Sequence, residues 1–201
     1  MIVPLPARPT DYERDAAGLE HAEFITASCF VRRAVLEAVD GFDERFAAAW
    51  REDSDLHFTL LERGQRVDRA PGAIVLHPVR QAPWGICLSQ QRKNLFNALL
   101  FKKFPRLYRR RIKASPTWDY YAIVASLAAA LVGAVAGPRG LAWAPLVVWS
   151  SLTARFCARR LARNSLSCRH VTELLVTSAL VPPLSVFWRL YGAFKFRVFF
   201  L

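Results

Sequence analysis

Three acidic residues, Glu52, Asp53 and Asp55, stand close together in the segment REDSDLHFTLLERG at residues 51–64. A carboxylate within hydrogen-bond reach of a hydroxyl group can remove its proton while the oxygen attacks an electrophile, which is general-base catalysis. Aspartate is also common at the first positions of helices, where it caps the backbone and interacts with the helix dipole. Taken alone, these acids favour helix capping, so a catalytic role for Asp53 needs support from the surrounding sequence.

Short alternating elements surround these acids. The apolar periodicity of residues 51–64 predicts a helix. Residues 24–31 are rich in β-forming and aromatic types and predict a strand, whereas residues 32–39 predict a helix. Two further short strands are predicted at residues 66–69 and 73–77. The order predicts an α/β fragment that is too short to be a complete doubly wound sheet.

Long apolar stretches dominate the second half of the chain. Residues 120–137 carry no charge and approach the ~20 residues that a helix needs to cross a bilayer. Residues 141–158 predict a second span. The short segment GPRG at residues 137–140 predicts a tight turn, which would join the two spans as a hairpin. The third stretch, residues 171–190, contains Pro182 and Pro183, which predict a kinked helix or a segment that re-enters on the same side. We therefore expect an all-α membrane region of two to three helices.

The formal net charge of +12 raises the question of nucleic-acid binding. The basic residues, however, cluster at residues 102–113 and 155–169, beside apolar stretches, as they do at the cytoplasmic flanks of membrane helices. We therefore expect membrane lipid and not nucleic acid as a partner.

The four cysteines form no CxxC pair and the N-terminus has no signal-peptide pattern. These features predict a multi-pass protein of the cytoplasmic (inner) membrane whose N-terminal part faces the cytoplasm.

Three segments in fixed order carry a family resemblance. They are TASCFVRRAVLEAVDGFDERF at 26–46, WREDSDLHFTLLERG at 50–64 and APGAIVLHP at 70–78. Together they resemble the C-terminal part of the catalytic domain of family 2 glycosyltransferases, which have the Rossmann-like GT-A fold. The resemblance implies that Asp53 is the general base that deprotonates the acceptor hydroxyl, and that Glu52 orients or supports it.

The same resemblance implies ligand-binding roles for other residues. His77 matches a histidine that, in some members, helps to hold the divalent metal bound to the nucleotide diphosphate, Mg or Mn. A single imidazole needs carboxylate partners to bind such a metal. His77 is equally well explained as a strand-terminal residue whose ring is satisfied by backbone groups. Gln90, Arg92 and Lys93 weakly resemble the family's Gln and Arg motif over the acceptor and diphosphate. The favoured alternative for that segment is an amphipathic interfacial helix whose Leu and Phe residues face lipid.

The chain also departs from the family pattern. Ser28 and Asp40 stand where the family usually has Asn and Gly, and the nucleotide-binding half with its DxD-type motif has no place in the few residues before the matching region. We therefore expect residues 1–113 to be a partial catalytic domain and residues 114–201 a membrane region. The resulting prediction is a glycosyltransferase fragment that transfers a sugar from a nucleotide-sugar to an envelope glycan or lipid-linked acceptor and is inactive alone. The alternative is a non-catalytic membrane scaffold, or a partner subunit whose nucleotide-binding half is another chain.

Overall fold

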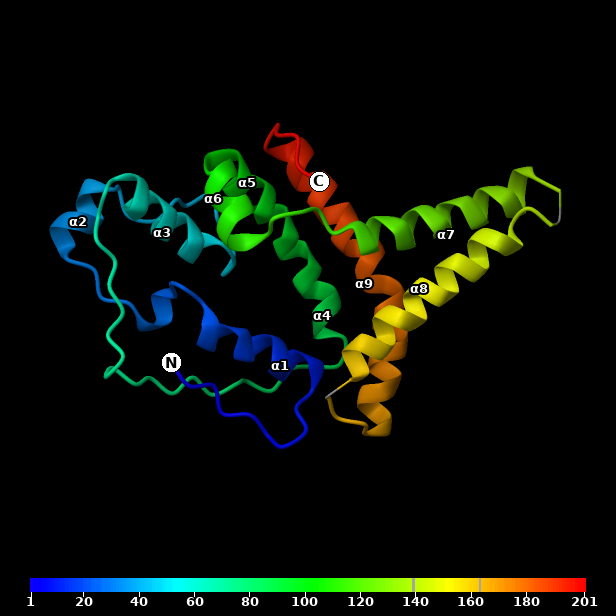
Figure 1. Cartoon of the computed structure of the whole chain (residues 1–201), viewed down its shortest axis with the longest axis horizontal. Coiled ribbons are helices and arrows are strands. Elements are labelled where there is room, and N and C mark those ends of the chain that lie inside the picture. Colours follow the sequence, from blue (N-terminus) through cyan, green and yellow to red (C-terminus); the bar gives the residue numbers. More distant parts are fainter. Residues whose placement is uncertain (139, 163) are drawn as a thin grey trace.

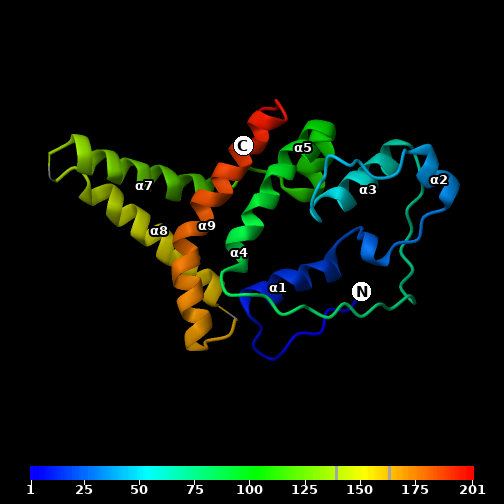
Figure 2. The same cartoon turned by 180° about the vertical axis from the view of Figure 1, so that it is seen from behind.

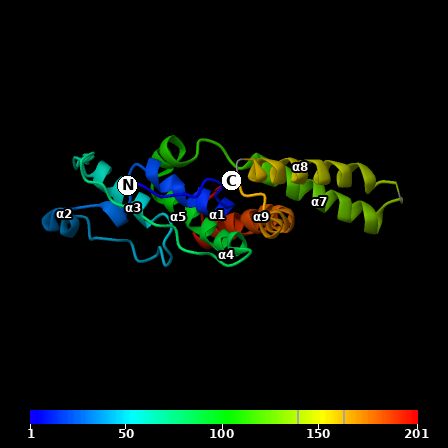
Figure 3. The same ribbon diagram turned by 90° about the horizontal axis from the view of Figure 1, so that it is seen from below.

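The computed structural model describes residues 1–138, 140–162 and 164–201, and its regular structure consists of helices joined by long loops (Figure 1). The N-terminal part contains the elements α1 (Asp11–Ala17), η1 (Gly18–His21), η2 (Thr26–Ser28), α2 (Arg33–Ala38), α3 (Glu52–Glu62), α4 (Ile86–Gln90), η3 (Gln91–Asn94), α5 (Leu95–Lys103), α6 (Pro105–Leu107) and η4 (Tyr108–Ile112). Three long helices follow, which are α7 (Trp118–Ala136), α8 (Trp143–Leu161) and α9 (Cys168–Lys195). The α7–α8 pair lies at one end of the molecule, and α2 and α3 lie at the other (Figure 3).

The predicted α/β, Rossmann-like GT-A fragment is wrong for the part of the chain that the structure describes, because no strand forms there. Residues 24–31 contain the short helical turn η2, and residues 66–69 form an exposed loop. Within residues 73–77, pairing is limited to one isolated parallel bridge between Ile2 and Leu76. β-forming side chains make a strand only where a neighbouring strand satisfies the backbone N–H and C=O groups. Among the described residues none of these segments pairs with another of them, so no sheet forms.

The two helices predicted in the N-terminal part are confirmed as α2 and α3. Between them, Asp40 and Gly41 both have positive φ angles, of 59° and 67°, which glycine adopts without strain and aspartate tolerates. Asp43 of this turn pairs with Lys103 Nζ on α5 at 2.7 Å. Lys103 Nζ also lies 2.7 Å from a carboxylate oxygen of Asp55 on α3. This lysine therefore connects the turn, α3 and α5.

One hydrophobic core joins α5 to the C-terminal end of α9. Phe200 is buried against α5, and Gly192 of α9 lies so close that a Cβ there would be 2.5 Å from the carbonyl oxygen of Leu95. The prediction of an interfacial helix with its apolar side chains toward lipid is wrong, because those side chains are buried in this core. They are Leu95, Phe96, Leu99 and Leu100. The core takes residues from both sides of the predicted 113/114 boundary, which remains a prediction.

The helices α7 and α8 pack side by side and form the predicted hairpin, which projects away from the rest of the molecule (Figures 1 and 2). Among the described residues, α7 and α9 are long and apolar enough to cross a membrane. Only 17% of the most apolar part of α7 is buried inside the protein, so its apolar surface is available to lipid. The second half of α8 carries Arg155, Arg159 and Arg160, and α8 does not reach the apolar character of a span.

The third apolar stretch forms one continuous helix of 28 residues, α9, with Pro182 and Pro183 inside it. A helix of this length extends about 42 Å at 1.5 Å per residue, which exceeds the thickness of the hydrocarbon core. Of the two alternatives predicted for this stretch, a kinked helix or a re-entrant segment, the re-entrant segment is wrong, because the structure shows one continuous helix that is long enough to cross. Ser167 caps its start, because its side chain accepts a hydrogen bond from the backbone N–H of His170.

Candidate functional site

A polar cavity of about 790 Å³ lies where the loop before α3, the turn η3, the start of α7 and the end of α9 come together. Its lining includes Arg51 directly before α3, Gln90 and Lys93 around η3, Trp118 at the start of α7 and Arg189 on α9. The volume is in the range of small-molecule binding sites in proteins. The cavity therefore combines several cationic side chains with an aromatic residue at the head of a candidate membrane helix.

The cavity includes two of the three predicted substrate-binding residues. Gln90 and Lys93 line it, and Lys93 Nζ lies 5.9 Å from the ring centroid of Trp50. Arg92 points elsewhere, since its guanidinium carbon lies 5.9 Å from the ring centroid of Trp188 and it does not line the cavity. The substrate-binding roles themselves remain predictions.

A chain of hydrogen-bonded amides lines the same cavity and was missed in the sequence. Arg51 Nε donates to Asn97 Oδ1 at 2.7 Å, and Asn97 Nδ2 donates to Asn94 Oδ1 at 3.1 Å. Asn94 Nδ2 in turn donates to Gln91 Oε1 at 2.9 Å and to Ser185 Oγ on α9 at 3.3 Å. The spacing of three between positions 91, 94 and 97 places them on one helix face, and this spacing was the available signal. The amide chain fixes the position of Arg51 at the cavity wall.

The two predicted catalytic acids occupy the first turn of α3, beside the cavity. Asp53 Oδ1 accepts hydrogen bonds from the backbone N–H of Thr26, at 3.3 Å, and from the Thr26 hydroxyl, so this carboxylate faces η2 and does not line the cavity. Burial raises the pKa of Glu52, and the charge of Asp53 raises it further, whereas Lys93 lowers it. Glu52 Oε2 is buried without a hydrogen-bond partner among the described residues. The roles of general base and supporting acid remain predictions for this pair.

The predicted metal ligand His77 lies outside this cavity. Its backbone N–H donates to the carbonyl oxygen of Ile2 at 2.9 Å, in the isolated bridge. Within the described ranges, no three His, Cys, Asp or Glu side chains gather in a way that could hold a metal ion. Mg and Mn require several oxygen ligands, so the described residues do not fit the expected divalent metal.

The comparison with known families agrees with the resemblance of the three sequence segments. A model of glycosyl transferase family group 2 matches residues 16–191. The chain belongs to this glycosyltransferase family. No curated protein and no solved structure matches the chain. The matched residues of this glycosyltransferase include α3, η3, α7 and most of α9, and therefore every element named above as a wall of the cavity.

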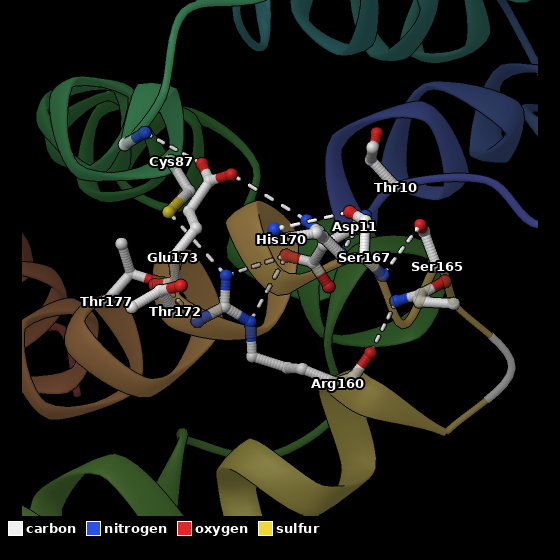
Figure 4. A network of polar contacts seen from close by, with 12 residues as sticks. Thr10, Asp11, Cys87, Arg160, Ser165, Ser167, His170, Thr172, Glu173 and Thr177 are labelled. Atoms are coloured by element: carbon white, nitrogen blue, oxygen red, sulfur yellow. Dashed lines mark hydrogen bonds and ion pairs between the residues drawn. The ribbon is translucent and has the colours of Figure 1, made fainter.

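A second polar cluster in the glycosyltransferase holds α1 against α8 and α9 (Figure 4). Arg160 of α8 donates to Asp11 Oδ2 of α1 at 2.7 Å and to Thr177 Oγ1 of α9 at 2.9 Å. Beside it, Glu173 accepts a hydrogen bond from the backbone N–H of Gly85 at 2.7 Å. From the sequence, Arg160 was assigned only to the basic cluster at residues 155–169, and Glu173 was given no role. The structure shows that both residues connect long helices to the N-terminal part.

Proposed function

We propose that this glycosyltransferase takes part in the transfer of a sugar from a nucleotide-sugar to an envelope glycan or lipid-linked acceptor at the cytoplasmic face of the membrane. The observation that carries the proposal is the cavity of about 790 Å³, which brings Gln90 and Lys93 next to the first turn of α3. Trp118 in the cavity wall is the first residue of α7, a helix that is apolar enough to cross a membrane. This position supports an acceptor located at the membrane–water interface.

In the proposed reaction, Asp53 accepts the proton of the acceptor hydroxyl while that oxygen attacks the anomeric carbon of the donor sugar. The hydrogen bonds from Thr26 fix the position of the Asp53 carboxylate at the start of α3. Lys93 and Gln90 contact the substrates, and the positive charge of Lys93 favours departure of the anionic diphosphate. A divalent cation is proposed for the complete enzyme alone, since the described residues of this chain do not fit one, and no step is assigned to it or to His77.

A second candidate function is that of a membrane scaffold or a subunit of a split glycosyltransferase. The observation that favours it is the position of Asp53, whose carboxylate is engaged by Thr26 and does not line the cavity. In that function the Asp53 carboxylate links the first turn of α3 to η2 and interacts favourably with the helix dipole, which is a structural use of aspartate. The two functions differ in whether transfer depends on polar residues of the cavity.

The test measures sugar transfer in membranes of the source organism, where any further chain that the reaction needs is present. Membranes from the wild type, a deletion strain and a Lys93→Gln strain are incubated with radiolabelled UDP-, GDP- and dTDP-sugars. Label is then counted in lipid extracts and in insoluble glycan. Lys195→Gln, an exposed lysine at the end of α9, is the matched control.

We expect the deletion to abolish incorporation from one donor, Lys93→Gln to reduce it at least tenfold, and Lys195→Gln to leave it unchanged. Unchanged incorporation from every donor in the deletion strain would contradict the glycosyltransferase function. Loss in the deletion strain with full activity in Lys93→Gln would instead support the scaffold function.

A further inference from the structure

The helix α9 contacts the N-terminal part of the chain from its first turn to its end. At its start, His170 Nε2 accepts a hydrogen bond from the backbone N–H of Asp11 at 3.2 Å. Directly after its end, the carbonyl oxygen of Phe196 accepts a hydrogen bond from Lys102 Nζ of α5 at 2.8 Å. Three further contacts lie between these two, namely Glu173 with the backbone N–H of Gly85, Ser185 with Asn94, and Gly192 with the backbone of Leu95. The N-terminal part therefore occupies one side of α9 from end to end.

Length and apolar character alone would allow α9 to cross a bilayer, but these contacts oppose it. Ser185 lies roughly 5 Å along the axis from the midpoint of α9, at 1.5 Å per residue. Its partner Asn94 belongs to η3, which packs on α9 and also contains Arg92 and Lys93. A crossing α9 would carry these two cations close to the centre of the hydrocarbon, where charged side chains are costly. Both ends of α9 therefore belong on the side of the membrane that holds the N-terminal part.

The side of α9 that faces away from the N-terminal part is apolar. Between Val171 and Phe194, the exposed side chains are Thr172 and seven large apolar ones, which form the outer face of α9: Leu175, Val176, Leu180, Phe187, Leu190, Tyr191 and Phe194. Their spacing places them on one face of a helix. A helix at the surface of a water-soluble domain turns polar side chains outward, so this outer face needs an apolar environment.

The hairpin of α7 and α8 indicates what covers the outer face. Both helices pack against α9, and α9 runs across the base of the hairpin, which extends away from it to one side (Figures 1 and 3). With the exposed apolar surface of α7 in lipid, α9 at the base of the hairpin lies at the bilayer surface. Exposed basic residues flank the outer face, with Arg169 at one end and Lys195 and Arg197 at the other. Such flanks are typical of helices that bind an anionic membrane surface.

We propose that α9 lies along the surface of the bilayer, with its outer face in the boundary between headgroups and acyl chains, and does not cross the membrane. Its Leu, Val and Phe side chains then leave water, and Tyr191 lies at the level that amphipathic aromatic residues favour. The flanking cations remain among the headgroups and attract anionic lipids. This arrangement of α9 does not rest on the proposed function, because it requires no sugar transfer.

The first test determines on which side of the membrane the two ends of α9 lie. Single cysteines are introduced into the full chain after all four native cysteines have been replaced by serine. Native Cys168 is restored at the start of α9, Lys195→Cys marks its end, and Glu62→Cys marks the N-terminal part; all three positions are exposed. Right-side-out and inverted membrane vesicles are then treated with a maleimide that does not cross membranes. We expect all three cysteines to be labelled from the same side, and labelling of Cys168 and Lys195→Cys from opposite sides would overturn the proposal.

The second test measures the depth of the outer face in the bilayer. Leu180→Cys and Phe187→Cys are labelled with the fluorophore NBD, and the full chain is reconstituted into vesicles of dioleoyl phosphatidylcholine and dioleoyl phosphatidylglycerol. A lipid with a nitroxide near its headgroup quenches shallow fluorophores, whereas a lipid with a nitroxide near the end of its acyl chain quenches deep ones. Ala129→Cys, at an exposed position near the middle of α7, calibrates the deep position. Circular dichroism establishes that each labelled variant is folded.

We expect the shallow nitroxide to quench the two outer-face sites at least twofold more strongly than the deep one does, with the reverse order at the α7 site. Stronger quenching of the Leu180 site by the deep nitroxide would overturn the proposal, because that position lies near the midpoint of a crossing α9. Absence of quenching by both nitroxides would overturn it as well, since a second copy of the chain or another protein would then cover the outer face. Should Leu180→Cys fail to fold, Phe187→Cys decides the outcome.

Discussion

Replacing Gly192 by alanine should destabilise the protein, although alanine favours helices. Alanine gains about 1 kcal/mol over glycine inside a helix. At Gly192, however, the new Cβ would lie 2.5 Å from the carbonyl oxygen and 2.8 Å from the Cα of Leu95, so backbone atoms of α5 would have to move. Overpacking of this kind costs about 1–3 kcal/mol, and contact with backbone places it at the upper end. The expected net loss is about 2 kcal/mol.

Thermal unfolding of the full chain in detergent micelles, followed by circular dichroism, measures this loss. For a chain of this size about 2 kcal/mol corresponds to a Tm lower by roughly 4–8 °C. The matched control is Gly18→Ala, where a Cβ would meet no atom within 4 Å and φ is −55°. We expect that control to be neutral or slightly stabilising. An unchanged or raised Tm in Gly192→Ala would refute the close contact between α5 and α9.

Three further predictions concern charges that form ion pairs between elements. Lys103→Met leaves the buried Asp55 without its cation and should cost about 3 kcal/mol, seen as a lower Tm that Asp55→Asn partly restores. Arg45 and then Lys103 lower the pKa of Asp43 well below its usual range. The ionised Asp43 therefore stabilises the folded protein fully above about pH 4, and this contribution is lost as the pH falls further. Asp43→Asn should make the Tm less sensitive to pH between about pH 4 and pH 2. Arg160→Gln should release α1 and speed limited proteolysis before residue 18, whereas the exposed Arg159→Gln should not.

The helices were predictable from the sequence because their signals are local. The periodicity of α3 and the apolar length of α7 depend on neighbouring residues alone. The predicted strands failed because a strand requires partners that are distant in sequence, and residues 24–31 and 66–69 find none among the described residues. The burial of α5 could not be predicted either, because its partner α9 lies about ninety residues further along the chain.

The candidate site was only partly visible in the sequence for the same reason. Gln90 and Lys93 were found through a family resemblance, and the structure places both at the cavity. Arg189 lies on α9 and Lys113 lies directly after η4, and both line the same cavity. In the sequence, a basic residue near the end of an apolar helix is typical of a cytoplasmic flank. The burial of Arg189, and its two nitrogens without a hydrogen-bond partner among the described residues, become apparent only when α9 is packed against α5.

The most direct test of the proposed function is the rate of sugar transfer in native membranes that carry Asp53→Asn, compared with Glu62→Gln at the exposed far end of the same helix. The amide preserves the shape of the side chain and its acceptor oxygen toward Thr26, but it cannot take the proton of the acceptor hydroxyl. General-base catalysis contributes about 10²–10⁴-fold, so we predict a loss of this size in Asp53→Asn with protein levels unchanged and full activity in Glu62→Gln. Transfer by Asp53→Asn at the wild-type rate would contradict the account.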